Sequence, residues 1–546
     1  MADEAKLLIK ASRDAVDAAL DVGRSQTNGG KDIDAHQVHA ERLAYAATEV
    51  AAAEALAAYA ASRRAAGAAD AALDAMTAAF AGELAGKLRA SLDSHADDFG
   101  LPASLVAETV GHPDVARAVR TTQHEARFRD IGRHVLETRG ANDGFVDGDM
   151  AEMARDSARQ FARKEVAPIA ERIHRHDELI PASIIESMAA LGYFGMSVPE
   201  AYGGQGLGNL VMIVITEELS TASLAAAGSL ITRPEILTKA LLKGGTEAQK
   251  RQWLPAVAAG ELMVGISVTE PDTGSDVASV RCKAERGEQD GRPGWFITGA
   301  KAWCTFAGRA DVLALLARTD PDMASRARGL SLFVVPKDRF AGHEFEMTQP
   351  GGGTLHGTAD ATPGYRGMHS YTLAFDRFFV PAENLIGEAA GEGQGFYLQM
   401  QGFAAGRLQT GGRACGVAQA ALEASATYAA ERKQFGQAIG DFQLTQFKLG
   451  RMATHLAAAR QLTYAAARAM DADESIALEP SMAKLFACDV AVWVTQEGQL
   501  LHGGWGYAEE FPISRYVVDA QVLPIFEGVK PILELKVIAR TLLAAR

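Results

Sequence analysis

Apolar residues recur at helical spacing through the first part of the chain. Residues 1–140 are rich in alanine and other helix formers, and five apolar residues within them follow one another at spacings of three and four: Leu43, Ala46, Val50, Ala53 and Ala57. Such spacing places apolar side chains on one face of a helix. We therefore expect residues 1–140 to form a bundle of four or five helices without a cluster of catalytic residue types. Its expected role is in packing or in extending a dimer, with regulation or partner docking as the alternative.

A segment rich in glycine, aspartate and asparagine, residues 139–149, follows and is typical of a linker. Beyond it, residues 150–262 return to helical patterns, with an amphipathic stretch from Asp156 to Arg172. Gly192 follows an apolar run and is the residue type that commonly ends a helix. We expect a second helical domain over residues 150–262.

The pattern changes in residues 263–385, where short runs rich in Val, Ile, Phe and Trp alternate with Gly, Asp and Pro. These runs predict strands at hairpin-like spacing, and hence a small β-barrel or sandwich. Residues 392–546 return to helical spacing, which fits a four-helix bundle. The predicted fold is mainly α with a central β-barrel domain, in four parts: 1–140, 150–262, 263–385 and 392–546.

Composition and charge narrow the class of protein. Of the 546 residues, 48% are hydrophobic and 22% charged, which is ordinary for a soluble globular protein. The formal net charge of −14 argues against a nucleic-acid-binding surface, because such surfaces are rich in Lys and Arg. The four cysteines are far apart and form no CxxC pair, so neither a zinc site nor a disulfide framework is predicted, and a reducing compartment fits.

The beginning of the chain has acidic residues where a signal peptide would be basic, and no apolar run of about 18 residues appears. We therefore expect a cytoplasmic protein with no membrane span. The two histidines of the stretch His174-Arg-His176-Asp177 have the residue type of metal ligands. No third ligand lies at a fitting spacing, so we expect no metal.

Two signatures between Gly265 and Ala307 carry the candidate chemistry. The first begins as an apolar, β-prone run at Ile266 and breaks into a tight turn over residues 274–276, where consecutive backbone N–H groups can cradle an anion. The second, residues 301–306, places Trp303 and Thr305 two apart, so on a regular strand they share one face. A flat indole beside a hydroxyl donor suits a flat heterocycle with a hydrogen-bonding nitrogen.

These signatures resemble the flavin-binding middle domain of the acyl-CoA dehydrogenase family, and the resemblance continues from about Asp149 to the C-terminus. It implies a helical, β, helical architecture with a helical extension added in front, and FAD as the cofactor. Val268 and Thr269 would then line the pyrimidine end, Thr305 would bind N5, and Trp303 would cover the face opposite the substrate. The expected flavin contacts from this part of the chain are Ile266, Val268, Thr269, Gly274, Ser275, Trp303 and Thr305.

Two further segments, residues 432–443 and 499–507, resemble the family's segments that reach the adenosine pyrophosphate of a neighbouring subunit's FAD. An arginine suits this role because its planar guanidinium matches phosphate. The resemblance therefore implies a homo-oligomer, either a dimer or a tetramer. The expected contacts are Arg432, Phe435, Gln443, Gln499 and Gly503.

The candidate base is Glu527, which lies among Ile525, Phe526 and Val529. A carboxylate among apolar side chains is a better base, because desolvation disfavours its charged form. A glutamate near a helix start is otherwise most often a cap. The segment resembles the family's Tyr-Glu-Gly-Thr motif, whose glutamate is the base, although Phe526 replaces the Tyr and Val529 replaces a Thr that contacts FAD. Some branches of the family carry the base elsewhere, and Gly406 occupies that position here.

The resemblance also places acyl-CoA contacts. Ser275, Arg407 and Gly528 are expected to touch the substrate, and the backbone N–H of Glu527 would donate to the thioester oxygen together with a flavin ribityl hydroxyl. The aspartate that often lies three residues before Arg407 is replaced by Ala404. The CoA contact at Arg407 therefore departs from the family pattern.

The layout of the chain, with Arg233-Pro234 and residues 365–370, resembles one branch of the family. That branch oxidises (2S)-methylsuccinyl-CoA to mesaconyl-CoA in the ethylmalonyl-CoA pathway. Such a substrate carries a free carboxylate, which is costly to bury without a cation or several donors. Arg233 is the candidate, with a surface or interhelix ion pair as the alternative. Arg366 is less attractive, because relatives with neutral acyl chains share it.

The leading hypothesis is an FAD-dependent α,β-dehydrogenase that passes electrons to electron-transferring flavoprotein. A branched short-chain or fatty acyl-CoA dehydrogenase is the alternative within the family. The family also contains flavin-bearing stress proteins that bind nucleic acid, but the acidic balance of the chain argues against that function. A non-catalytic scaffold conflicts with the presence of Glu527, Thr305 and Trp303.

Overall fold

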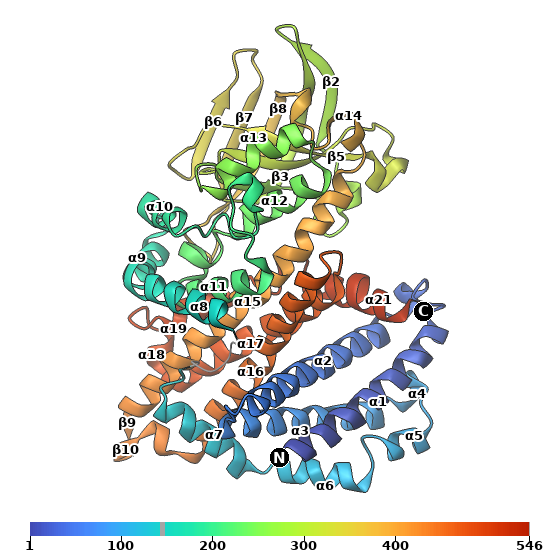
Figure 1. The fold of residues 1–546 in the computed structure, drawn as a ribbon, viewed down its shortest axis with the longest axis vertical. Coiled ribbons are helices and arrows are strands. Elements are labelled where there is room, and N and C mark those ends of the chain that lie inside the picture. Colours follow the sequence, from blue (N-terminus) through green and yellow to red (C-terminus); the bar gives the residue numbers. More distant parts are fainter. Residues whose placement is uncertain (142–147, 545–546) are drawn as a thin grey trace. The chain divides into compact units, whose positions relative to one another are not determined.

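The computed structural model describes residues 1–141 and 148–544 (Figure 1). Most of the predicted linker, residues 142–147, lies outside the described residues. The chain folds into two units. Unit 1 contains residues Met1–Glu152 and Thr410–Arg546, and unit 2 contains Met153–Gln409.

The N-terminal part of unit 1 is helical, as the apolar spacing predicts. Three helices of more than 20 residues, α1 (Ala2–Gln26), α2 (Gln37–Ala65) and α3 (Ala71–Ser94), pack on one another. Leu43, Val50 and Ala53 of the predicted stripe are buried. Four shorter helices complete the described part of this region: α4 (Ala96–Phe99), α5 (Ala103–Glu108), α6 (Pro113–Thr122) and α7 (Glu125–Glu137).

The C-terminal part of unit 1 is a helical bundle. Its long helices are α15 (Gly395–Glu431), which enters unit 1 at Thr410, α16 (Gln443–Ala472) and α17 (Leu478–His502). Helix α16 packs on α2, α3 and α7, so the N-terminal extension and the C-terminal bundle share one core. Shorter elements follow α17: α18 (Gly504–Tyr507), α19 (Ile513–Ala520), α20 (Lys530–Ile532), the π-helix η9 (Leu533–Ala539) and α21 (Arg540–Leu543).

Charged side chains join the extension to the bundle around a cavity of about 340 Å³ between α2, α3, α16 and α17. Arg451 of α16 pairs with Glu83 of α3, and His455 Nε2 lies 3.3 Å from the same carboxylate. Burial alone would raise the pKa of Glu83, but the hydrogen bonds from His455 and Arg451 lower it to about 2. The extension is therefore held to the bundle by polar contacts as well as by its apolar faces.

Unit 2 begins with helices that cover a sheet. They are α8 (Asp149–Phe161), α9 (Ala167–His176), α10 (Ala182–Ala190), α11 (Gly208–Ala222), α12 (Thr232–Gly244) and α13 (Glu247–Ala258). Gly192, predicted to end a helix, follows α10 with a φ of 75°, a conformation that favours glycine. Within the described residues, no helix has both the length and the apolar character needed to cross a membrane.

The sheet of unit 2 contains eight strands: β1 (Val264–Ser267), β2 (Lys283–Gln289), β3 (Arg292–Thr305), β4 (Val312–Arg318), β5 (Leu330–Pro336), β6 (Glu344–Thr348), β7 (Thr354–Ala359) and β8 (Ser370–Pro381). Its order is β1-β4-β2-β3-β8-β7-β6, with β5 on β4. The long antiparallel pair β3–β8 lies at its centre. The sheet curls into a half-barrel, and the predicted fold class is confirmed.

The core of unit 2 lies between the helices and the parallel pair β1–β4. Leu237 of α12, Leu254 of α13, Val264 of β1 and Leu316 of β4 belong to one buried apolar cluster. Strand β4 is buried along its whole length, as expected for a strand that is covered on both faces. The helices thereby anchor β1, which leads directly into the first candidate signature.

Candidate active site

Strand β3 ends in a bulge that displays Trp303. The pairing of β3 with β8 shifts register between Lys301 and Cys304, and Trp303 has a φ of 58°. The indole is 59% exposed, whereas the Thr305 side chain is buried. The prediction that both side chains share one face assumed regular alternation, and the bulge interrupts it. Bulges of this kind re-aim a side chain and are frequent beside active sites.

The end of β3 is tied to the start of β8. The Thr305 hydroxyl lies 3.0 Å from the Ser370 hydroxyl, and the Phe306 N–H donates to the His369 carbonyl at 2.8 Å. These contacts hold Thr305 in place beside the exposed indole. An exposed flat ring and a positioned hydroxyl, two residues apart, fit the expected flavin.

A buried ion pair supports the first signature from within. The Lys301 ammonium is fully buried and donates to the Val268 carbonyl at 2.9 Å and to Glu270 Oε1 at 3.0 Å. The Glu270 carboxylate also accepts the backbone N–H groups of Arg281 and Cys282, both at 2.7 Å. The predicted flavin contact Val268 therefore depends on Lys301.

The prediction from sequence did not include Lys301 or Glu270. Each lies inside one of the two signatures: Glu270 follows the β-prone run that ends at Thr269, and Lys301 lies between two alanines. Two charged residues of opposite sign, one in each signature, could have indicated this ion pair.

The turn after the first signature is open to ligand. Gly274 and Ser275 are exposed, just before a 3₁₀ turn over Val277–Ser279. A Cβ added at Gly274 would meet only Thr269, at 3.7 Å, which is an ordinary contact. Packing of this turn therefore does not require glycine at 274. A glycine at this position would instead allow a bound group, such as a phosphate, to approach the backbone closely.

Glu527 lies in a tight turn of unit 1. Its φ is 57° and that of Gly528 is 99°, so two consecutive residues have the left-handed sense. For a glutamate this conformation costs of order 1–3 kcal/mol and is most frequent at functional sites. Glu527 is half-buried, but Ile525 is 59% exposed, so Ile525 does not enclose the carboxylate as its place in the sequence suggested.

Two buried cations hold the residues on either side of Glu527. Lys484 of α17 donates to the Gly528 carbonyl at 2.6 Å. The guanidinium carbon of Arg413 lies 4.7 Å from the centre of the Phe526 ring. Both cations are almost fully buried. The turn that carries Glu527 is thus fixed by α15 and α17, which explains how a strained conformation persists.

The N-terminal extension contacts the segment that follows Glu527. Lys530 Nζ lies 2.6 Å from Asp489 Oδ2, and the same oxygen accepts the Tyr45 hydroxyl of α2 at 2.8 Å. Glu534, one turn beyond Lys530, is buried. Burial raises the pKa of Glu534 to about 7, while the Lys530 ammonium at 3.8 Å opposes this shift and Glu41 and Asp489 add to it.

This shift predicts a pH dependence of stability. The folded pKa of Glu534 lies above the ordinary value of about 4.3, so the folded state binds more protons between these values and is destabilised as pH rises through them. Above pH 7 the charged Glu534 lowers the free energy of unfolding by about 3 kcal/mol. We expect Glu534→Gln to raise the melting temperature at pH 8, and this gain to shrink as pH is lowered towards 5. The exposed Glu510→Gln is the control, and an equal gain at both pH values would contradict the assignment.

Arg432 and Gly503 line one open cavity of about 560 Å³ in unit 1, together with Tyr428, His502 and Trp505. Gly503 has a φ of 61°, and an added Cβ there would meet nothing within 4 Å. This arrangement brings together one residue from each of the two predicted adenosine segments. It offers an aromatic wall beside a guanidinium, which suits a nucleotide.

The other three predicted residues of this group do not line the cavity. Gln499 donates to the Gly506 carbonyl at 3.1 Å, and Gln443 is exposed at the start of α16. Phe435 is 95% exposed, and Tyr507 and Leu500 are 88% and 68% exposed. Of these three exposed apolar side chains, Leu500 lines the cavity.

The two predicted substrate-binding arginines of unit 2 are buried. Arg233, at the start of α12, is 4% exposed and donates to the Ser229 carbonyl at 3.2 Å. Arg407 of α15 is also buried. Arg366 is held by α9, because it donates to the His174 carbonyl at 3.3 Å and lies 3.6 Å from Asp177 Oδ1. Arg233 is therefore not a surface cation.

Most of the chain matches domains of known proteins. Three family models match consecutive stretches, described as the N-terminal, middle and C-terminal domains of acyl-CoA dehydrogenase: residues 148–261, 265–378 and 393–543. The chain is 44% identical over 443 residues to (2S)-methylsuccinyl-CoA dehydrogenase of Cereibacter sphaeroides, which covers 80% of this chain and 78% of that protein.

Solved structures agree with this match. Butyryl-CoA dehydrogenase from Megasphaera elsdenii is 30% identical with a TM-score of 0.65, over 71% of this chain and 97% of that one. A glutaryl-CoA dehydrogenase from Mycobacterium smegmatis in complex with FADH2 is 25% identical with a TM-score of 0.62, over 72% of this chain and 95% of that one. The chain therefore belongs to the acyl-CoA dehydrogenase family of FAD-dependent enzymes.

Proposed function

We propose that this enzyme oxidises (2S)-methylsuccinyl-CoA to mesaconyl-CoA, as in the ethylmalonyl-CoA pathway. The observation that carries this proposal is the extent of the 44% identity. The matched stretch covers 80% of the chain and is longer than the part covered by the three family models. It therefore reaches into the N-terminal extension, which those family models do not include.

In this proposal Glu527 takes the proton from the α-carbon of the thioester. FAD would supply the acceptor for the hydride of the β-carbon, and loss of the proton and the hydride would leave a carbon–carbon double bond. The backbone N–H of Glu527 donates to the thioester oxygen, where negative charge develops. Lys484 and Arg413 keep the turn in the conformation that these roles need.

The flavin is held by the residues around β1 and β3. The exposed Trp303 indole would cover one face of the ring, and the Thr305 hydroxyl, positioned by Ser370, would bind N5. Val268 and Thr269 meet the pyrimidine end, and the open turn at Gly274 receives phosphate. Ile266, Ser275, Arg407 and Gly528 complete the proposed cofactor and substrate contacts.

We infer that the enzyme works as a homo-oligomer of at least two subunits. The cavity lined by Arg432 and Gly503 receives the adenosine pyrophosphate of a partner subunit's FAD, with Phe435, Gln443 and Gln499 around it. The strongly exposed Phe435 and Tyr507 support an interface here. The electrons leave to electron-transferring flavoprotein.

Arg233 is the proposed partner of the second carboxylate of the substrate. It is a buried cation at the start of a helix, where both the side chain and the helix dipole favour an anion. A buried carboxylate without such a partner costs several kcal/mol. A neutral acyl chain gains nothing from the arginine.

This assignment predicts a change of specificity rather than a general loss. We expect Arg233→Lys to raise the KM for methylsuccinyl-CoA about 10- to 100-fold, since a charge-assisted fork is lost. The KM for butyryl-CoA should stay within about twofold, because its acyl chain carries no charge. Steady-state kinetics with a dye acceptor measures both values.

The same assay tests the proposed function in the unmodified enzyme. The expected kcat/KM for methylsuccinyl-CoA exceeds those for butyryl-CoA and isobutyryl-CoA by about 100-fold or more. A preference for a neutral acyl-CoA would replace the proposal by a branched short-chain or fatty acyl-CoA dehydrogenase. Equal losses of Arg233→Lys on charged and neutral substrates would give Arg233 a structural role.

A further inference from the structure

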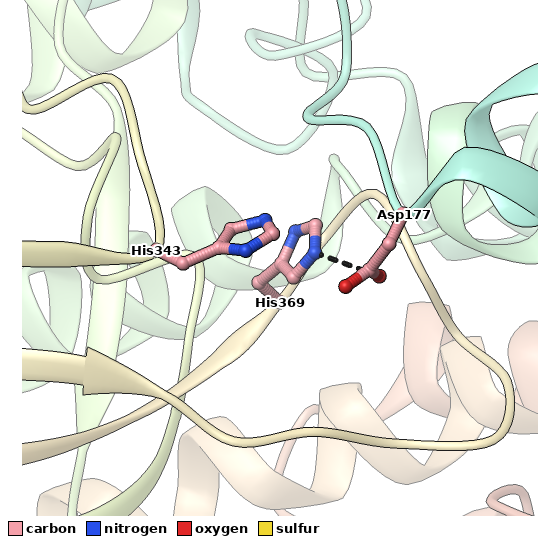
Figure 2. A group of neighbouring side chains, drawn as sticks. All are labelled: Asp177, His343 and His369. Atoms are coloured by element: carbon pink, nitrogen blue, oxygen red, sulfur yellow. Dashed lines mark hydrogen bonds and ion pairs between the residues drawn. The ribbon is translucent and has the colours of Figure 1, made fainter.

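Two histidines and an aspartate from distant parts of unit 2 meet beside the start of β8 (Figure 2). Asp177 follows the last residue of α9 and has a φ of 54°. His343 lies in the segment before β6, and His369 immediately precedes β8. The two imidazole rings lie 4.5 Å apart between centres, and His369 Nε2 is 3.1 Å from Asp177 Oδ1.

His369 is the buried member of this cluster. It is 6% exposed, and its Nδ1 makes no hydrogen bond among the residues that the structure describes. Figure 2 shows this nitrogen on the side of the ring that faces His343. When Nε2–H donates to Asp177, Nδ1 carries a lone pair. Leaving such an acceptor buried and unsatisfied costs about 1–3 kcal/mol.

The chemistry of the cluster suits a metal ion. A ring N–H that donates to a carboxylate orients an imidazole whose other nitrogen binds metal. An imidazole binds a metal through an unprotonated ring nitrogen. Imidazole nitrogens favour Zn²⁺, Ni²⁺ and Cu²⁺ over Mg²⁺ and Ca²⁺.

The three ligand atoms lie somewhat farther apart than around a bound ion, and one of the side chains can move. One ligand atom from each residue can be chosen so that all three lie within 4.8 Å of one another. Around Zn²⁺, with bonds near 2.0–2.1 Å, neighbouring ligand atoms are roughly 3.3 Å apart. His343 is exposed, so rotation of its side chain can close most of this difference without disturbing the core.

Arg366 is the group that opposes a cation here. Its Nε lies 3.6 Å from Asp177 Oδ1, so guanidinium and metal would share one carboxylate. Arg366 is also engaged by two backbone carbonyls, at Thr362 and His174, which hold it on its own side of Asp177. Competition between Arg366 and the ion for the Asp177 carboxylate lowers the metal affinity but does not prevent binding.

We propose that Asp177, His343 and His369 bind one divalent transition-metal ion such as Zn²⁺, with water completing its coordination. The site is separate from the proposed base Glu527, but it adjoins the segment that carries the proposed flavin contact Thr305. The His369 carbonyl accepts from Phe306 N–H, and Ser370 contacts Thr305. A bound ion would join α9 to β8 and stiffen the end of β3.

The prediction of no metal from the sequence rests on His174 and its close neighbours alone. The cluster instead combines Asp177 with two histidines more than 160 residues later in the chain. Helix α9 and strands β6 and β8 bring them together, and ligand spacing along the chain carries no sign of this.

The test uses the full-length, FAD-loaded enzyme after chelator treatment, titrated with Zn²⁺ by calorimetry. We expect one ion per chain with a Kd of roughly 1–100 µM, because only three protein ligands contribute and one is shared with Arg366. Mg²⁺ under the same conditions should give no saturable heat. Zn²⁺ should also raise the melting temperature, a readout that is independent of activity.

His343→Ala should weaken Zn²⁺ binding at least about 10-fold while the fold is kept, because the residue is exposed. His356→Ala removes an exposed histidine of β7 outside the cluster and is the matched control. His369→Gln should abolish binding. Absence of saturable Zn²⁺ binding by the unmodified enzyme, or equal affinities of the His343 and His356 variants, would overturn the proposal.

Discussion

Glu527→Gln should abolish acyl-CoA oxidation while FAD stays bound. Glutamine has nearly the same shape as glutamate but cannot accept the α-proton, and a positioned general base contributes about 10²–10⁴ to rate. Since Glu527 is the proposed base, we expect the rate of anaerobic flavin reduction to fall about 10³-fold or more. Stopped-flow absorbance measures this rate directly, without an external electron acceptor.

The exposed Glu510→Gln is the matched control and should reduce its flavin at the unmodified rate. FAD content and melting temperature of the Glu527 variant should stay close to those of the unmodified enzyme, because its turn is held through Gly528 and Phe526 and not through the carboxylate itself. Rapid flavin reduction by the variant would place the base elsewhere.

Lys301→Met should have the largest effect on stability and on FAD retention. The change leaves the buried Glu270 carboxylate without its cation, and breaking a buried ion pair by removing one partner costs about 3–5 kcal/mol. The Val268 carbonyl also loses its donor, so the predicted flavin edge loosens. Thermal unfolding and the ratio of bound FAD to protein measure the two consequences.

A double variant separates this cause from a loss of packing. Lys301→Met with Glu270→Gln removes both charges, so part of the lost stability should return, as double-mutant cycles reveal for contacting residues. Lys448→Met, at a half-buried lysine of α16 paired with Glu497, is the control and should cost less than about 1 kcal/mol. A double variant that is less stable than the single one would contradict this role for the ion pair.

Structural features that depend on local periodicity and on short motifs could be predicted from the sequence. The spacing of Leu43, Val50 and Ala53 predicted a buried helix face, and the change of pattern after residue 262 predicted strands. These predictions hold because side-chain direction repeats with the period of the element. The roles of the motif residues, including Glu527 and Trp303, stay predictions.

Features that depend on pairing between distant segments were not predictable in this way. The bulge at Trp303 arises from the register of β3 on β8, which no residue count along β3 reveals. The pairing of Lys301 with Glu270 spans two signatures, and the contact of Tyr45 with Asp489 joins the two ends of the chain. The spacing of apolar residues along a helix shows which face is buried, but not which element covers that face.

The most direct test of the account is a single anaerobic turnover of the FAD-loaded enzyme with (2S)-methylsuccinyl-CoA. We expect the flavin absorbance to bleach fully and one equivalent of mesaconyl-CoA to form per flavin, identified by mass spectrometry. Bleaching by butyryl-CoA but not by methylsuccinyl-CoA would contradict the proposed substrate. Absence of bleaching with every acyl-CoA would contradict the dehydrogenase activity itself.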